Sequence, residues 1–186
     1  MTKFFKKIFA FVFDLIETIV FALAIFVVIY LFLFQPHQVK GASMEINFHD
    51  GEYILTDKIS YRFHSPQRGD VVIFKAPTNP ELDYIKRIIG LPGERIKIED
   101  NSLFINGQKL EEEYLPKETI ISGGSFLPKR EEIIIPPDHY FVLGDNRSHS
   151  SDSREWGWIE KEEIVGRAFL RYWPPEKFGL LTKVHY

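Results

Sequence analysis

Charged residues are absent from one long stretch near the N-terminus, which reads TIVFALAIFVVIYLFLF from Thr18 to Phe34. A run of 17 residues lies at the short end of what spans a bilayer as a helix, and Ile16 and Glu17 at its boundary can extend it. The run shows no polar stripe, although a helix of this length in a soluble core normally has one. The pattern therefore predicts a transmembrane helix over residues 16–34.

Three basic residues precede this apolar run, before any acidic residue: Lys3, Lys6 and Lys7. By the positive-inside rule, this charge places residues 1–15 in the cytoplasm and the rest of the chain outside the plasma membrane. A cleavable signal peptide has a similar basic start and apolar stretch. The run exceeds the usual apolar core of such peptides, and residues 35–37 (QPH) are a poor cleavage context, so we expect a retained single-pass anchor.

Beyond Pro36 the pattern changes to short runs of Ile, Val, Phe and Tyr between turn residues, which is typical of an all-β domain. We predict strands at Tyr53–Leu55, Asp70–Lys75, Tyr84–Ile89, Arg95–Glu99, Leu103–Ile105, Glu132–Ile135, Tyr140–Leu143 and Val165–Tyr172. Asp100-Asn101 has the composition of a hairpin turn between two of these strands, and Asn106-Gly107 ends the second.

Prolines fall between the predicted strands, where a missing donor does no harm: Pro77, Pro80, Pro92, Pro116, Pro136 and Pro137. The predicted fold class is mostly β, with one N-terminal transmembrane helix followed by a β-rich domain over residues 35–186. Within that domain, residues 111–130 are charged and contain glycine, so we expect a variable, exposed excursion there.

Composition narrows the possible functions. A chain of 186 residues can form one compact domain and an accessory segment. Its net charge of −3 gives no electrostatic basis for binding nucleic acid. The lack of cysteine excludes disulfides, thiolate metal sites and a cysteine nucleophile. The six histidines have neither i,i+4 nor H-E-x-x-H spacing, so we expect no metal site and no cofactor.

The first candidate for chemistry is Ser43, in the stretch KGASMEIN just beyond the apolar run. Its neighbours Gly41 and Ala42 are small and allow the close backbone approach that a nucleophile needs. Linkers next to membranes are also rich in glycine and serine, so this stretch alone favours an ordinary linker.

The second candidate is the stretch YIKRIIGLPGE, residues 84–94, where Lys86 and Arg87 interrupt an otherwise apolar strand. Side chains alternate between the faces of a strand, so we expect one of the two to face the core. The ordinary alternative to a buried lysine is that Lys86 lies at an edge of the sheet, with its amine in solvent. A buried Lys86 would have a lowered pKa, and a drop of about three units would make the amine a usable base near neutral pH.

The third candidate is the loop LGDNRSHSSDSREWG, residues 143–157. Its turn-forming residues are typical of a polar surface loop. It also carries two Asp/Arg couples, which we expect to pair as Asp145 with Arg147 and Asp152 with Arg154. A loop with its own ion pairs would be rigid enough to support a site.

Together and in this order, these segments resemble the bacterial type I signal peptidases, membrane-bound endopeptidases with a Ser–Lys dyad. The apolar anchor, the Ser-Met box, RGDVVIFKAP, DYIKRIIGLPGE and GDNRSHSSDSR all match. The last segment fits the family pattern G-D-N-R-x-x-S-x-D-S-R at every fixed position. The resemblance covers residues 16–173, and it implies cleavage of signal peptides from exported preproteins at the outer face of the membrane, with lipid as the other partner.

The resemblance implies a role for each matching residue. Ser43 would be the nucleophile and Lys86 the general base. Ser150 matches a serine that orients the lysine, while Asp152 and Arg154 match a supporting ion pair beside the site.

Further positions follow from the same match. Gly144 would line the catalytic region, and Met44 and Ile85 would shape apolar pockets for small substrate side chains. The family usually reads S-M-x-P-T-L, whereas this chain has Ile46-Asn47 in place of proline and threonine. We expect that change to loosen the turn behind the nucleophile or to alter the specificity pockets, without touching the dyad.

Other functions remain to be tested. A Ser–His–Asp hydrolase predicts His139 or His149 beside Ser43, but no nucleophile-elbow pattern surrounds the serine. The hypothesis of a metal hydrolase has even less support, because the histidines lack the spacing of metal ligands. A non-enzymatic relative, a membrane-anchored β domain with altered or lost activity that binds export partners, is the remaining alternative.

Overall fold

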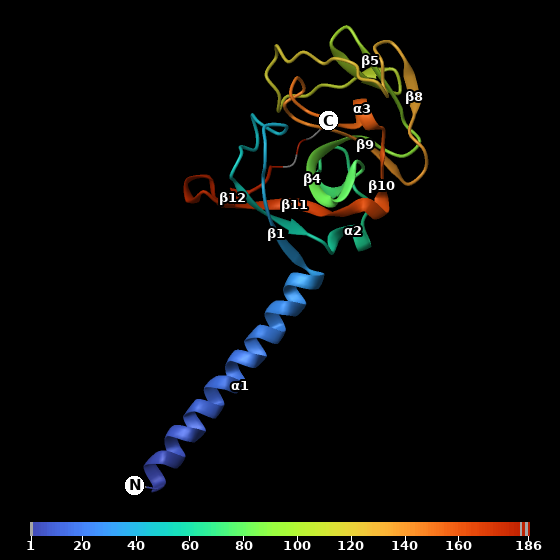
Figure 1. Ribbon diagram of the computed structural model, residues 1–186. Coiled ribbons are helices and arrows are strands. Elements are labelled where there is room, and N and C mark those ends of the chain that lie inside the picture. Colours follow the sequence, from blue (N-terminus) through green and yellow to red (C-terminus); the bar gives the residue numbers. More distant parts are fainter. Residues whose placement is uncertain (1, 183, 185) are drawn as a thin grey trace.

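The computed structural model describes residues 2–182, 184 and 186. A long N-terminal helix, α1 (Thr2–Phe32), projects from a domain built of short strands (Figure 1). The predicted fold class, mostly β with a single N-terminal apolar helix, is confirmed. The helix begins earlier than the predicted span and ends two residues before it, because Phe34 already belongs to a strand.

From Thr18 to Phe32 the α1 helix carries no charged residue on any face, and its stretch from Phe4 to Phe32 is long and apolar enough to cross a membrane. None of that segment is buried inside the protein. Large side chains such as Phe9 and Phe21 are therefore exposed, at 74% and 69%. An uncharged helical segment that no described part of the protein covers fits a membrane anchor, because lipid can cover this surface.

The larger sheet has the strand order β1-β2-β11-β3-β4-β9-β10, and β12 pairs with β11. Its strands are β1 (Phe34–Gln38), β2 (Tyr53–Asp57), β3 (Val71–Ala76), β4 (Asn79–Gly90), β9 (His139–Leu143), β10 (Ile159–Glu160), β11 (Ile164–Trp173) and β12 (Gly179–Leu180). All the pairings are antiparallel, as expected of a sheet built from short strands and turns.

A smaller antiparallel sheet has the order β7-β6-β5-β8. Its strands are β5 (Arg95–Glu99), β6 (Ser102–Ile105), β7 (Gln108–Lys109) and β8 (Glu132–Ile134). Asp100 and Asn101 both have positive φ, as a type I′ hairpin turn requires, so that predicted turn is confirmed. The described part of the domain also contains four short helices: α2 (Ser60–Phe63), α3 (Ser153–Trp156), η1 (Lys161–Glu163) and η2 (Pro175–Lys177).

Every predicted strand is present, but β1, β7, β10 and β12 were not predicted. Three of these have two residues each, and β1 reads FQPHQ, without the expected apolar alternation. The placement of Pro80 between strands was wrong, because it lies in β4. Proline is tolerated there because the register is shifted between Lys75 and Ala76 of the facing strand.

Residues 111–130 contain no strand or helix, but the expectation of an exposed excursion was wrong for part of the segment. Ile121 and Leu127 belong to the core cluster beneath the smaller sheet, with exposures of 5% and 0%. Leu115 is also buried. These apolar side chains hold an irregular backbone against the domain, because their burial stabilises the segment without a strand partner.

A second core cluster lies under the candidate nucleophile. It contains Met44, Phe48, Val39 and Ile85, together with residues of β2, β3 and β11. The turn that carries Ser43 is therefore fixed to the larger sheet from both of its ends.

Candidate active site

The turn that follows β1 presents Ser43 between anchored residues. Gly41, at φ +82°, takes a backbone conformation that favours glycine, and its N–H donates to Asp50 Oδ1 at 2.7 Å. Met44 has no exposed surface, and Phe48 is 3% exposed. Ser43 itself is half-buried. Its hydroxyl is thus held at the surface of a rigid turn.

Lys86 reaches this hydroxyl from β4. Its Nζ lies 2.8 Å from Ser43 Oγ and 3.0 Å from the backbone oxygen of Ile85. The lysine is 4% exposed. Burial lowers the pKa of its amine to about 8, and the carboxylates of Asp152 and Asp145 only partly oppose the shift.

Lys86 and Arg87 are both buried, so the expectation that only one of them faces the core was wrong. From Ile85 to Gly90, β4 is buried at every position. A strand with other elements on both sides buries both of its faces. Each of the two cations must then find its own partner inside the protein.

Arg87 finds that partner in Asp145. Its Nε and Nη2 donate to the two carboxylate oxygens at 2.8 and 2.6 Å, and Asp145 is fully buried. The expected pair of Asp145 with Arg147 was therefore wrong. Arg147 instead donates to both carboxylate oxygens of Glu112, at 2.7 and 2.6 Å. A buried charge needs a close, well-aligned partner, and nearness in sequence did not provide one.

Asp152 and Arg154 do pair with each other. Arg154 Nε and Nη2 each lie 2.8 Å from a carboxylate oxygen of Asp152. Asp152 also accepts from the backbone N–H of Gly144 at 3.1 Å. Arg154 Nη2 donates in addition to the backbone oxygen of Arg147 at 2.7 Å. This pair ties the two ends of the 144–154 loop together beside Lys86.

Gly144 and Ser150 pack against the nucleophile turn. A Cβ atom at Gly144 would overlap Ser150 Oγ and the backbone oxygen of Ser43, so only glycine fits there without movement. Among the residues that the structure describes, Ser150 Oγ is buried without a hydrogen-bond partner. The structure thus brings Ser150 to the site but does not join it to Lys86.

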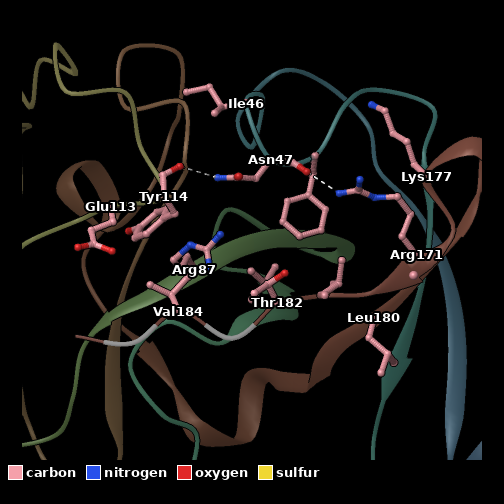
Figure 2. A pocket seen from close by; sticks show the side chains of 14 residues that line it. Ile46, Asn47, Arg87, Glu113, Tyr114, Arg171, Lys177, Leu180, Thr182 and Val184 are labelled. Atoms are coloured by element: carbon pink, nitrogen blue, oxygen red, sulfur yellow. Dashed lines mark hydrogen bonds between the residues drawn. The ribbon is translucent and has the colours of Figure 1, made fainter.

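Asn47 connects the nucleophile turn to the buried ion pair. Its Nδ2 donates to Asp145 Oδ2 at 2.9 Å and to the backbone oxygen of Tyr114 at 3.3 Å. Its own backbone oxygen accepts from Arg171 Nη2 at 2.5 Å. Figure 2 shows Asn47 between Tyr114 and Arg171. All three residues line a cavity of about 560 Å³. Although Asn47 departs from the family pattern, its hydrogen bonds fix the turn that carries Ser43.

Ile46, the other changed residue, has a φ of +96°. Such an angle is an outlier for a β-branched side chain and is not available to proline. Proline, which the family usually has here, could not adopt this φ, so the backbone of the turn at Ile46 differs from one that holds proline.

A cleft of about 500 Å³ opens beside Ser43 and Lys86. Ile85 lines this cleft. Met44 has no exposed surface and packs beneath the turn instead, where its Sδ accepts from the N–H of Asp145 at 3.4 Å. Sequence reasoning missed other apolar lining residues, namely Val39, Ile54 and Ile73. The alternation in the strands of Ile54 and Ile73 indicated burial, but not which cavity the side chains face.

The histidines proposed for a Ser–His–Asp site bond elsewhere. His139 Nδ1 contacts the backbone oxygen of Pro137 at 2.7 Å, and His149 Nδ1 contacts Ser148 Oγ at 2.9 Å. The group that contacts Ser43 Oγ is a lysine. In the described part of the chain, no group of three or more metal-binding side chains is placed to hold an ion.

Comparison with known proteins places the chain in a family. Residues 12–173 match the family model described as signal peptidase, peptidase S26. A probable signal peptidase I-2 of Synechocystis is 36% identical over 175 residues, covering 91% of this chain and 77% of the relative. A signal peptidase IB of Staphylococcus aureus is 34% identical over 179 residues, covering 89% and 93%. The crystal structure of a signal peptidase I from Enterococcus faecalis is 32% identical, with a TM-score of 0.45, covering 56% of this chain and 97% of that one.

Proposed function

The chain belongs to the signal peptidase family, peptidase S26, and we propose that Ser43 and Lys86 are its nucleophile and its general base. The protein is a membrane-anchored serine endopeptidase that cleaves N-terminal signal peptides from exported preproteins. One observation carries the assignment of the dyad: the buried Lys86 amine lies 2.8 Å from Ser43 Oγ.

The lowered pKa makes Lys86 suitable as a base. At pH 7, an amine with a pKa of about 8 is neutral about 9% of the time, against about 0.04% for an ordinary lysine. The neutral amine takes the proton of Ser43 as its oxygen attacks the scissile carbonyl, and an acyl-enzyme forms. The resulting ammonium donates a proton to the leaving amine. Lys86 then takes a proton from the water that hydrolyses the acyl-enzyme.

The developing oxyanion needs a hydrogen-bond donor. The backbone N–H of Ser43 donates to no protein group among the described residues. The N–H of Gly41 is already bonded to Asp50, and the N–H of Asn146 donates to the Ser43 backbone oxygen at 3.0 Å. We therefore assign the Ser43 N–H to the oxyanion, where one such donor typically contributes about 3 kcal/mol to the transition state.

The residues around the dyad have supporting roles in this proposal. Ser150 orients the Lys86 amine, and the pair of Asp152 with Arg154 fixes the loop that carries Ser150. Gly144 allows that loop to approach the nucleophile turn. The roles of Gly144 and of the Asp152–Arg154 pair are supported by the packing of Gly144 against Ser150 and Ser43 and by the bond from Gly144 N–H to Asp152. The role of Ser150 is supported by its buried hydroxyl, which has no other partner among the described residues.

An extended substrate has two strand edges to pair with. Residues Asn79–Lys86 of β4 pair with β3 alone, and β1 pairs with β2 alone, within the part of the chain that the structure describes. The cleft beside Ser43 lies between these two edges. A signal peptide can therefore bind by adding a strand, with its backbone bonded to the enzyme and its small side chains in the apolar lining.

For the topology, we propose that residues 1–15 lie in the cytoplasm, that the membrane anchor is the rest of α1 up to Phe32, and that the domain from β1 onward lies outside. The basic N-terminus supports this orientation. The anchor also concentrates the enzyme where its membrane-inserted substrates are found.

The test is processing of a signal-peptide-bearing preprotein by the full chain in detergent micelles. The wild type should release the mature protein, while Ser43→Ala and Lys86→Ala should each abolish release. Lys109→Ala, at an exposed position, is the matched control and should cleave normally. Cleavage retained in Lys86→Ala would exclude the dyad, and no cleavage by the wild type would favour a non-enzymatic relative.

A further inference from the structure

The cleft beside the dyad changes character along its length. Near Ser43 its lining is apolar, with Val39 on one side and Ile85 on the other. Farther from Ser43, the lining includes His37 and Asp83. Val39 directly follows β1 and continues its extended pairing, because its N–H donates to the Glu52 backbone oxygen at 2.8 Å. Side chains two residues apart in an extended segment point to the same face, so His37 follows Val39 and Asp83 follows Ile85 along the cleft.

His37 and Asp83 meet across the cleft and are held in place. His37 Nε2 lies 3.3 Å from Asp83 Oδ2, and His37 Nδ1 lies 2.9 Å from Thr56 Oγ1. Lys75 Nζ holds the other carboxylate oxygen at 2.8 Å. The His37 and Asp83 side chains are 12% and 24% exposed, so a bound substrate side chain would cover what surface remains.

The register of an extended substrate follows from this geometry. Alternate residues of a strand are about 6.6 Å apart, the same step that separates the Val39/Ile85 position from the His37/Asp83 position. β1 begins directly after the anchor helix, so the His37 end of the cleft is nearer to the anchor (Figure 1). A signal peptide precedes its cleavage site and comes from the membrane, so its chain runs from His37 toward Ser43.

The side chain just before the scissile bond, at position −1, then meets Val39 and Ile85. The side chain at position −3 meets His37 and Asp83. An apolar side chain at −3 would remove water from the Asp83 carboxylate without replacing its hydrogen bonds, which is unfavourable. A hydroxyl at −3 can donate to that carboxylate and restore the lost bond.

We propose that the His37–Asp83 pair makes this enzyme select a hydroxyl-bearing side chain, threonine or serine, three residues before the scissile bond. This selectivity rests on the proposed signal-peptide cleavage by Ser43 and Lys86. It concerns the polar end of the cleft and leaves the dyad unchanged.

Two preproteins that differ only at −3, with threonine in one and the isosteric valine in the other, provide the test. The measured quantity is the ratio of their kcat/KM values with the full chain in detergent micelles, and a third substrate with alanine at −3 reports an intact active site. The wild type should favour threonine by about tenfold, as expected for a hydrogen bond that one substrate cannot make.

Variants of His37 and Asp83 show whether the threonine preference depends on this pair or on negative charge in general. Asp83→Leu should abolish the threonine preference, and His37→Phe should reduce it, because Asp83 then loses a donor that holds it. Asp83→Asn keeps an acceptor and should retain the preference. Glu131→Leu, an exposed acid outside the cleft, should match the wild type.

A wild type that cleaves the valine substrate as well as the threonine one would overturn the proposal. So would a threonine preference that persists unchanged in both Asp83→Leu and His37→Phe while the alanine substrate is cleaved. A wild type that cleaves none of the three substrates would overturn the proposed function together with this inference.

Discussion

Replacing Lys86 by methionine should abolish cleavage and yet stabilise the fold. Methionine is of similar length and apolar, so it can fill the same space without a charge. The buried amine is a cost to folding, because burial lowers its pKa from 10.5 to about 8. This cost is separate from the benefit that the same shift brings to catalysis.

The magnitude follows from the two pKa values. At about 1.4 kcal/mol per pH unit, the difference between 10.5 and about 8 corresponds to about 3 kcal/mol. Below pH 8 the amine is charged in both states, and the folded state bears the whole cost. Between pH 8 and 10.5 the unfolded state binds more protons, so the stability of the wild type rises with pH. The stabilisation by methionine should therefore be largest below pH 8 and disappear above pH 10.5.

The assay is denaturant unfolding of the full chain in detergent micelles at pH 6 and pH 10, followed by tryptophan fluorescence. All three tryptophans, Trp156, Trp158 and Trp173, lie outside α1 and report on the β domain. Lys97→Met removes a surface lysine and should change the free energy of unfolding by less than about 1 kcal/mol. If Lys86→Met were no more stable than wild type at pH 6, or gained equally at both pH values, the reasoning would be refuted.

Three other outcomes follow from the site. The kcat/KM of the wild type should rise with pH to a plateau with a midpoint near 8, whereas a single step near 6.5 that persists in Lys86→Ala would point to a histidine. Gly144→Ala should lower kcat/KM about 100-fold, because the new Cβ displaces Ser43 or Ser150. The control is Gly179→Ala, where the new Cβ meets no atom within 4 Å, and equal activity of the two variants would contradict the packing described for Gly144. Asn47→Ala should lower the free energy of unfolding by about 1 kcal/mol, and in steady-state kinetics it should lower kcat more than it raises KM. An unchanged kcat would show that the bond from Asn47 to Asp145 does not position the turn that carries Ser43.

The strands were predictable because their apolar residues recur in short runs between turn formers. The turn at Asp100-Asn101 was predictable for a similar reason, since these residues tolerate the positive φ that the hairpin requires. β1 was missed because its residues are mostly polar and include Pro36. Its place at an edge of the larger sheet, beside β2 alone among the described strands, tolerates that composition.

The partners of the buried charges were not predictable. Sequence proximity suggested Asp145 with Arg147, but each binds a partner far away in the chain, Arg87 and Glu112. Which charges meet depends on how the strands and loops pack, and no local pattern encodes that. The Asp152–Arg154 pair could be predicted because the turn of α3 brings both side chains to one place.

The candidate dyad came from a family resemblance together with the unusual position of a lysine in an apolar strand. The polar end of the cleft had no such signal. His37, Thr56 and Asp83 come from three separate strands, and only the packing of the sheet brings them together.

The most direct test of the account is the pKa of the Lys86 amine, measured by NMR titration of isotope-labelled lysine side chains in the full chain. The signal missing from Lys86→Met identifies the residue. The account predicts a midpoint near pH 8 for that signal. A midpoint near 10.4, the value of an ordinary exposed lysine, would contradict it.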